Sequence, residues 1–207
     1  MMPDKVLVAG AGGHAKVVID AMRSAGLPFE IVVADDDGRK HDQALLGYRV
    51  ITPLNNALAG VGAFHVAIGD NAIRARVTEY LTGLGLAPIS VLHPRASIAA
   101  TVRIGNGAFV AAQSVLGPDA MLETGCIVNH GTIVDHDCHV GAFSHIAPGA
   151  TLAGGVRIGT RVLVGAGANI LPGVTIGDDC VVGAGAVVLN DLEAGSVHVG
   201  VPARKFR

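Results

Sequence analysis

In the second half of this chain every sixth residue is Ile, Leu or Val, without interruption from Ile98 to Val188. A strict period of six residues is typical of a parallel β-helix, in which each hexad supplies one short strand and one corner. Three hexads close a triangular coil of about 18 residues, and each coil pairs with the next. The pattern therefore predicts a three-sided prism of about five coils with no long loop leaving it.

A second column of residues lies two positions before each ladder residue and contains nothing larger than Val. It includes all three cysteines of the chain, Cys126, Cys138 and Cys180. Small side chains are what a tightly turned corner with little inner space requires. We therefore interpret the cysteines as packing residues, and not as redox, metal-binding or disulfide-forming groups.

The composition agrees with a solenoid of small and β-branched residues, because 50% of the chain is hydrophobic but only 3% is aromatic. A net charge of −2 gives no reason to expect binding to nucleic acid or to an anionic membrane. No apolar stretch reaches membrane-spanning length, and the first residues lack the basic region of a secretory signal. The expectation is a cytoplasmic protein.

Residues 4–92 follow a different pattern, in which short apolar strands alternate with helical stretches and glycine turns. The expected strands cover residues 6–9, 31–34, 48–51, 64–68 and 89–92. This alternation predicts a small parallel α/β domain, so we divide the chain into an α/β domain over 1–92 and a prism with its tail over 93–207. Ligands of such sheets bind at the carboxyl ends of the strands, where the glycine turn, Asp35, Asp36 and Gly69 are expected.

The glycine turn Gly10-x-Gly12-x-x-Ala15 fits the dinucleotide fingerprint with alanine at the third position, and Asp35 lies near the expected acidic position. Such a turn either cradles a diphosphate at a helix N-terminus or is only a tight strand–helix turn. A domain of about 90 residues is half of the usual dinucleotide fold. We therefore expect Gly12 and Gly13 to bind the phosphates of a mononucleotide or nucleotide sugar, and not NAD.

Four histidines cluster in the prism, at His130, His136, His139 and His145. None falls in an inward-facing column, so each is either solvent-exposed or functional. His136 has the strongest case, because Asp135 and Asp137 flank it. A carboxylate beside an imidazole raises its basicity and fixes its tautomer, as a general base near neutral pH requires.

A zinc site is the obvious rival, since some hexapeptide-repeat proteins are zinc carbonic anhydrases. Those proteins have two histidines five residues apart and a third elsewhere. The other histidines here lie at minus six, three and nine residues from His136. We therefore expect no metal.

The chain resembles the NeuD/PglD family of sugar acyltransferases over nearly its whole length. The residues that carry the resemblance are, in order, Gly10-Ala11-Gly12-Gly13-His14-Ala15, Asp35-Asp36, Ala67-Ile68-Gly69-Asp70-Asn71, Asn129, His136-Asp137, Phe143-Ser144-His145 and Gly200-Val201-Pro202-Ala203-Arg204. The resemblance implies a left-handed β-helix. It also implies a homotrimer that uses acetyl-CoA, with active sites in the clefts between adjacent prisms.

The resemblance further implies a role for each residue of the acetyl-transfer site. His136 would take a proton from the sugar amine, and Asp137, where many relatives carry Glu, would tune it. Asn129 would line the sugar site. The implied acetyl-CoA contacts are His145 and the amide of Gly154 at the thioester, with Ala166 and Ala184 along the pantetheine path.

On the α/β side, the resemblance implies that His14, Asp35 and Asp36 contact a nucleotide-linked amino sugar. The leading hypothesis is N-acetylation of a 4-amino-dideoxy sugar for surface glycan synthesis, by direct transfer because the cluster holds no covalent nucleophile. O-acetylation of a sialic-type sugar is the close alternative, and the acidic strand end at 35–37 favours ribose hydroxyls over a sugar carboxylate. A zinc carbonic anhydrase or a non-catalytic scaffold is less favoured. The basic tail Arg204, Lys205 and Arg207 either contacts coenzyme A phosphates or caps the solenoid.

Overall fold

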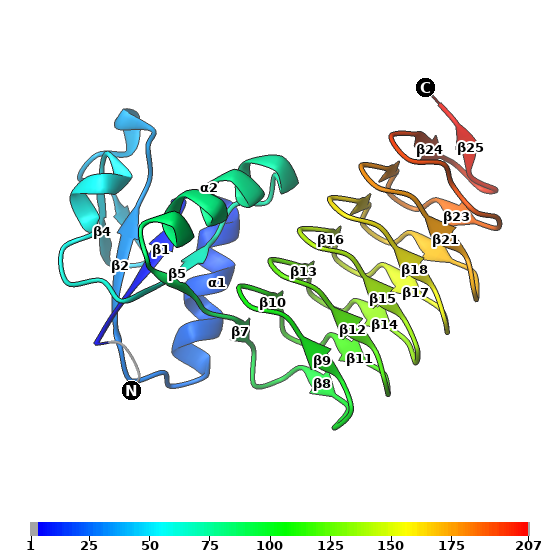
Figure 1. Cartoon of the computed structure of the whole chain (residues 1–207), viewed down its shortest axis with the longest axis horizontal. Coiled ribbons are helices and arrows are strands. Elements are labelled where there is room, and N and C mark those ends of the chain that lie inside the picture. The colour runs from blue at the N-terminus through cyan, green and yellow to red at the C-terminus, as the bar shows by residue number, and fades with distance from the viewer. Residues whose placement is uncertain (1–3, 207) are drawn as a thin grey trace.

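The computed structural model describes residues 4–206, which form an α/β domain followed by a long prism of stacked coils (Figure 1). The α/β sheet has the strand order β3-β4-β2-β1-β5-β6. Its strands are β1 (Lys5–Ala9), β2 (Glu30–Ala34), β3 (Ala44–Leu45), β4 (Tyr48–Ile51), β5 (Ala63–Val66) and β6 (Ala87–Pro88). All pairs are parallel except β3 with β4.

From residue 4 onward, the helices of this domain are α1 (Gly13–Ser24), the 3-10 helices η1 (Gly38–Lys40) and η2 (Leu54–Ala57), and α2 (Asn71–Gly83). Helix α2 begins where the Asp70 side chain accepts a hydrogen bond from the N–H of Ile73 (2.8 Å), as an N-cap does. Helix α1 begins at a glycine N-cap that makes no side-chain hydrogen bond.

The two faces of the sheet are covered differently. Val18, Ile19 and Met22 of α1 pack in one cluster with Phe109 and Ile127 of the prism, so α1 is sandwiched between the sheet and the prism. Helices α2 and η2 cover the opposite face. Each aliphatic side chain buried in these layers stabilises the fold by about 1.5–3 kcal/mol.

The prism has three faces, each formed by stacked parallel strands. The first, called the domain face, lies against the α/β domain and contains β7 (Val91–Leu92), β10 (Phe109–Val110), β13 (Ile127–Val128), β16 (His145–Ile146), β19 (Leu163–Val164), β22 (Val181–Val182) and β24 (Val197–Val199). The second face contains β8 (Ser97–Ile98), β11 (Val115–Leu116), β14 (Ile133–Val134), β17 (Thr151–Leu152), β20 (Asn169–Ile170) and β23 (Val187–Val188). The third face contains β9 (Arg103–Ile104), β12 (Met121–Leu122), β15 (His139–Val140), β18 (Arg157–Ile158) and β21 (Thr175–Ile176).

Four-residue turns separate consecutive strands from β7 to β23 and make three corners. The first corner, between the domain face and the second face, carries Asn129. The second corner, between the second and third faces, carries His136. The third corner leads back to the domain face and carries Phe143. The hexad pattern thus predicted both the strands and their register.

One predicted strand was wrong. Instead of a fifth α/β strand over 89–92, Ala87–Pro88 pairs with β5, while Val91–Leu92 pairs with Phe109–Val110 of the prism. Leu92 lies six residues before Ile98 and is itself aliphatic, so the ladder begins one step before the run that we took from Ile98. The division of the chain near residue 92 remains a prediction.

The ladder residues and the cysteine column form the prism core, and Cys126, Cys138 and Cys180 are free and fully buried, as predicted. At the far end β25 (Arg204–Lys205) turns back and pairs antiparallel with β24. Arg207 lies outside the described residues. No helix within residues 4–206 is long and apolar enough to cross a membrane.

Candidate active site

A pocket of about 340 Å³ opens at the carboxyl ends of β1, β2 and β5. Five of the residues predicted to bind the nucleotide sugar line it together: Gly12, Gly13, His14, Asp35 and Gly69. Lys40 contributes a cation to the same wall. The pocket lies where the ligands of parallel sheets bind.

Glycine stands at positions 10, 12 and 13 of the turn for different physical reasons. Gly10 has φ +107°, and a Cβ there would lie 2.8 Å from Cγ1 of Ile68, so the turn requires glycine. A Cβ on Gly12 or Gly13 would meet no protein atom within 4 Å. These two glycines therefore leave the N-terminus of α1 open, and its free N–H groups and helix dipole favour an anion.

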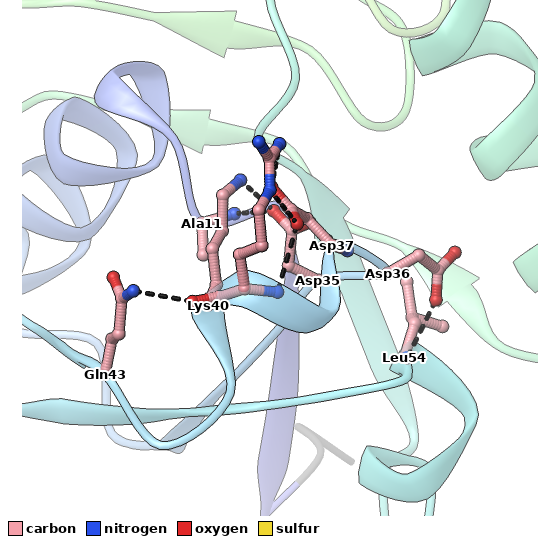
Figure 2. A network of polar contacts seen from close by, with 8 residues as sticks. Ala11, Asp35, Asp36, Asp37, Lys40, Gln43 and Leu54 are labelled. Atoms are coloured by element: carbon pink, nitrogen blue, oxygen red, sulfur yellow. Dashed lines mark hydrogen bonds and ion pairs between the residues drawn. The ribbon is translucent and has the colours of Figure 1, made fainter.

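Asp35 organises the turn (Figure 2). Its Oδ2 accepts hydrogen bonds from the N–H of Ala11 (2.7 Å) and from Nζ of Lys40 (2.7 Å), and its Oδ1 accepts one from the N–H of Asp37 (2.9 Å). Burial alone would raise the pKa of Asp35, but these hydrogen bonds hold it below its ordinary value. Asp35 thus fixes the glycine turn and the Lys40 ammonium in place.

Asp36 points the other way, toward η2 (Figure 2), and its Oδ1 accepts a hydrogen bond from the N–H of Leu54 (2.9 Å). It lines a second pocket of about 330 Å³ with Leu54, Asn55, Arg76, Val77 and Tyr80. Six of the seven predicted sugar-binding residues are therefore divided between two pockets, and Asn129 lies on the prism. Sequence reasoning did not identify Arg76 or Tyr80, although their spacing of four places both on one face of a helix.

On the domain face, His14 of α1 meets His145 of β16, with ring centroids 6.3 Å apart. Asn129 joins them, its Nδ2 lying 3.2 Å from Nε2 of His145. Because Oδ1 of Asn129 accepts a hydrogen bond from the N–H of His130 (2.9 Å), the amide of Asn129 presents its N–H to His145. Nε2 of His145 is then an acceptor, and the ring proton lies on Nδ1.

Both histidines of this pair are held neutral. Burial lowers the pKa of His14 to about 3, with further contributions from the nearby His65 and His145. Burial and the Arg74 charge lower the pKa of His145 to about 4. Nε2 of His14 is buried and has no hydrogen-bond partner among residues 4–206. One residue that lines the pocket therefore has a polar atom without a protein partner.

His136 lies at the second corner, where Asp137 has φ +59°. This left-handed conformation suits Asp better than most residues. Nδ1 of His136 lies 2.8 Å from Oδ2 of Asp137, so the ring proton on Nδ1 is donated to the carboxylate and Nε2 is left free. The Asp137 hydrogen bond and then the Asp135 charge raise the pKa of His136.

Gly154 lies one coil above His136. A Cβ on Gly154 would come within 2.5 Å of both Cε1 and Nε2 of the imidazole. The ring of His136 therefore occupies the space that a side chain at position 154 would need, and its free nitrogen lies against the Gly154 backbone.

A single chain does not bring all the predicted residues together. His145 is on the domain face, and Asn129, Ala166 and Ala184 are on or beside the first corner. His136 and Gly154 are at the second corner, across the second face. No hydrogen bond or ring contact links the two sets among the described residues.

Two exposed tracks run along these corners. At the first corner the exposed Ala166 and Ala184 are stacked, and the N–H of Gly185 donates to the carbonyl of Ala166 (2.8 Å). At the second corner a hollow of about 520 Å³ with Pro172 and Asn190 in its wall lies beyond Gly154.

Of the two remaining histidines of the cluster, one lies apart from both sets and the other lies beside Asn129. His139 lies on the third face with Nε2 2.8 Å from Oε1 of Glu123. His130 follows Asn129 at the first corner. Within the part of the chain that the structure describes, no group of three or more His, Cys, Asp or Glu side chains is arranged to hold a metal ion.

Family models match both halves of the chain. Residues 5–81 match the PglD N-terminal domain, and residues 155–190 match the bacterial transferase hexapeptide repeat. A GDP-perosamine N-acetyltransferase from Escherichia coli is 34% identical over 168 residues, which cover 77% of this chain and 74% of the relative.

Solved structures match over nearly the whole chain. The acetyltransferase domain of PglB from Neisseria gonorrhoeae is 38% identical with a TM-score of 0.92, covering 98% of this chain and all (100%) of that one. PerB from Caulobacter crescentus, solved with CoA and GDP-perosamine, is 38% identical with a TM-score of 0.91, covering 98% and 97%. The prism is thus the left-handed β-helix of these acetyltransferases, and the chain belongs to the NeuD/PglD family of hexapeptide-repeat sugar acyltransferases.

Proposed function

We propose that the protein transfers an acetyl group from acetyl-CoA to the amino group of a nucleotide-linked 4-amino-dideoxy sugar. The observation that carries this proposal is the pairing of His136 with Asp137, which leaves Nε2 free against the backbone of Gly154. The named relatives support the substrate class, because they are a GDP-perosamine and a UDP-N-acetylbacillosamine N-acetyltransferase.

The nucleotide sugar is assigned to the α/β domain. Its diphosphate would lie on the N–H groups of Gly12 and Gly13 at the start of α1, near the Lys40 ammonium. The second pocket, with the apolar Leu54 and Val77 beside Tyr80, has the shape and chemistry for a nucleobase. The sugar would then extend from the glycine turn past Gly69 toward His14 and Asn129.

The acetyl transfer is assigned to His136. Its neutral Nε2 would take a proton from the sugar amine as the amine nitrogen attacks the thioester carbon. The C–N bond forms, the C–S bond breaks, and the proton then passes to the leaving thiolate of coenzyme A. The Gly154 N–H would stabilise the negative charge that develops on the carbonyl oxygen. No covalent acetyl-enzyme is needed.

We propose a homotrimer, because one chain leaves the acetyl-transfer residues on two separate corners. When the second corner of one prism lies beside the first corner of its neighbour, His136 and Gly154 face Asn129, His145 and the Ala166–Ala184 track across one cleft. Val115 and Ile133, exposed on the second face between these corners (40% each), supply apolar surface for such packing.

The cytoplasm is the proposed location, which the three free cysteines support. A role in surface glycan synthesis is likewise part of the proposal and rests on the substrate class.

The deciding experiment incubates the purified protein with acetyl-CoA and GDP-, UDP- or dTDP-linked 4-amino-4,6-dideoxy sugars. Release of the free thiol together with an amide-linked acetyl sugar is the expected result. An acetyl ester on a sugar hydroxyl would instead identify an O-acetyltransferase. No thiol release with any of the three nucleotides would refute the proposal, and acetylated protein accumulating without sugar would refute direct transfer.

A further inference from the structure

Arg74, on the first turn of α2, is a fully buried cation (1% exposed). Its Nε donates to the carbonyl of Gly125 (2.8 Å), and its Nη2 donates to the carbonyl of Phe143 (2.6 Å). Within residues 4–206, no carboxylate lies within ion-pair distance of this guanidinium. Its charge is instead surrounded by carbonyl oxygens, an arrangement that is costly unless every donor is used.

Asn71, three residues earlier on α2, continues the same pattern. Its Nδ2 donates to the carbonyls of Arg161 (2.9 Å) and Val162 (3.1 Å), and its Oδ1 accepts a hydrogen bond from Nη2 of Arg74 (2.9 Å). Two linked side chains of one helix therefore contact the prism.

Three of the four prism carbonyls that they contact belong to equivalent positions. Gly125, Phe143 and Arg161 are spaced 18 residues apart at the third corner, and all three have left-handed φ angles of +66°, +57° and +56°. Three residues of α-helix rise about 4.5 Å, and adjacent coils are about 4.8 Å apart. The first turn of α2 thus matches the coil spacing, and Asn71 and Arg74 contact three successive coils.

The other side of Arg74 reaches the nucleotide-sugar pocket. Its Nη1 donates to the carbonyls of Ile68 (3.1 Å) and Gly69 (3.2 Å), which line that pocket. Phe143, which accepts from Nη2, lies two residues before His145. Arg74 therefore ties the pocket wall directly to the segment that carries a histidine of the acetyl-transfer site.

We propose that Asn71 and Arg74 are positioning residues that set how far the sugar end of the pocket lies from the acetyl-transfer residues of the prism. The proposal rests on the proposed function for its catalytic consequence. Gly12, Gly13 and Asp35 are carried by the α/β domain and have no hydrogen bond to Asn71 or Arg74, so phosphate binding at the glycine turn should be kept when these contacts are loosened. What such loosening disturbs is the alignment of the reacting atoms, where a displacement of about 1 Å can cost roughly 100-fold in rate.

The test compares Arg74→Met, Arg74→Lys and Asn71→Ala with the control Arg49→Met, whose arginine is exposed and forms an ion pair with Asp42. Turnover, both KM values and the calorimetric Kd are measured with the nucleotide sugar that the wild type acetylates best. For Arg74→Met we expect kcat, measured at saturating nucleotide sugar, to fall about 10- to 100-fold, while KM and Kd for the sugar change less than about 3-fold. Arg74→Lys should recover part of this loss, and Asn71→Ala should lose less than Arg74→Met.

Two results would overturn the proposal. One is a kcat at saturating nucleotide sugar that equals the wild-type value, both in Asn71→Ala and in whichever Arg74 variant folds. The other is a fall in sugar binding that accounts for the whole loss of activity.

Hydrogen exchange tests the contact independently of catalysis. Faster exchange at the first turn of α2 and at Phe143 in Asn71→Ala, but not in Arg49→Met, is expected. Unchanged exchange in Asn71→Ala would refute the role of the contact, whether or not the wild type is active. A wild type that acetylates none of the sugars would refute the proposed function alone.

Discussion

The imidazole of His136 lies directly against the backbone of Gly154, so that a single added carbon at position 154 would come 2.5 Å from Nε2. The nitrogen that would take the amine proton and the N–H assigned to the oxyanion are thus held next to each other by adjacent coils. The pairing of β14 with β17 maintains this arrangement, because the strands before both turns are in register.

The first prediction concerns His136 itself. His136→Ala should lower kcat by roughly 10² to 10⁴, the usual contribution of a general base. The side chain is more than half exposed (58%), so the fold and oligomeric state should not change. His139→Ala, on the third face, is the control and should retain most activity. Near-normal turnover in His136→Ala would remove it from its assigned role.

A second prediction concerns the pH dependence that Asp137 imposes. Asp137 raises the pKa of His136, and the base acts only when neutral. Asp137→Asn keeps an acceptor for Nδ1 but removes the charge, so the acid limb of kcat/KM should move to lower pH while the plateau falls. Asp137→Glu should keep the limb near its wild-type position. A limb that does not move in Asp137→Asn would mean that another group titrates.

Gly154→Ala should reduce turnover by displacing the imidazole of His136. We expect kcat to fall at least about 10-fold, since a misplaced base loses much of its contribution. Gly83→Ala is a matched control, because a Cβ there meets no atom within 4 Å. Wild-type kcat in Gly154→Ala, measured by thiol release, would contradict the described packing.

Replacing Gly13 by Val should raise KM for the nucleotide sugar without changing acetyl-CoA binding. Because a Cβ at Gly13 meets only open space, the protein itself should tolerate the side chain, and the effect should report on the ligand. Calorimetry with each substrate separates the two. An unchanged KM in Gly13→Val and in Gly12→Val would show that the turn is only structural.

Stability should fall as the solution is acidified from about pH 6.5 to about pH 4. Burial lowers the pKa of His14 to about 3 and of His65 and His145 to about 4, against an ordinary 6.5. In this window the unfolded chain binds protons that the folded chain does not, so protonation favours unfolding. Urea unfolding at several pH values measures the slope, and His65→Leu should reduce it. A flat profile would contradict the neutral buried state.

Much of the prism was predictable because its period is enforced at every turn. The aliphatic ladder and the small-residue column are separate constraints with the same spacing, so strand positions and register followed together. Leu92 fits the period of six and Ala96 fits the small-residue column, but Ile89 to Leu92 also resembled an α/β strand and was assigned to that domain.

The site was predictable in part. The glycine turn, Asp35 and Gly69 meet at one sheet edge, as parallel strands require. Asp36 lies in a different pocket because consecutive residues at a strand end point to opposite sides. The contact of Arg74 with the prism could not be found from sequence, since its partners there are main-chain carbonyls 51 and 69 residues away. Only the folded third corner brings these carbonyls to it.

The antiparallel return of β25 onto β24 has a consequence for how these molecules can associate. A column of parallel strands ends in a row of unpaired backbone groups, which another molecule could extend without limit. On the domain face, β25 runs in reverse over that row, so Arg204 and Lys205 break the direction that a further parallel layer would need. Head-to-tail extension of the domain face by a further parallel strand is thereby disfavoured.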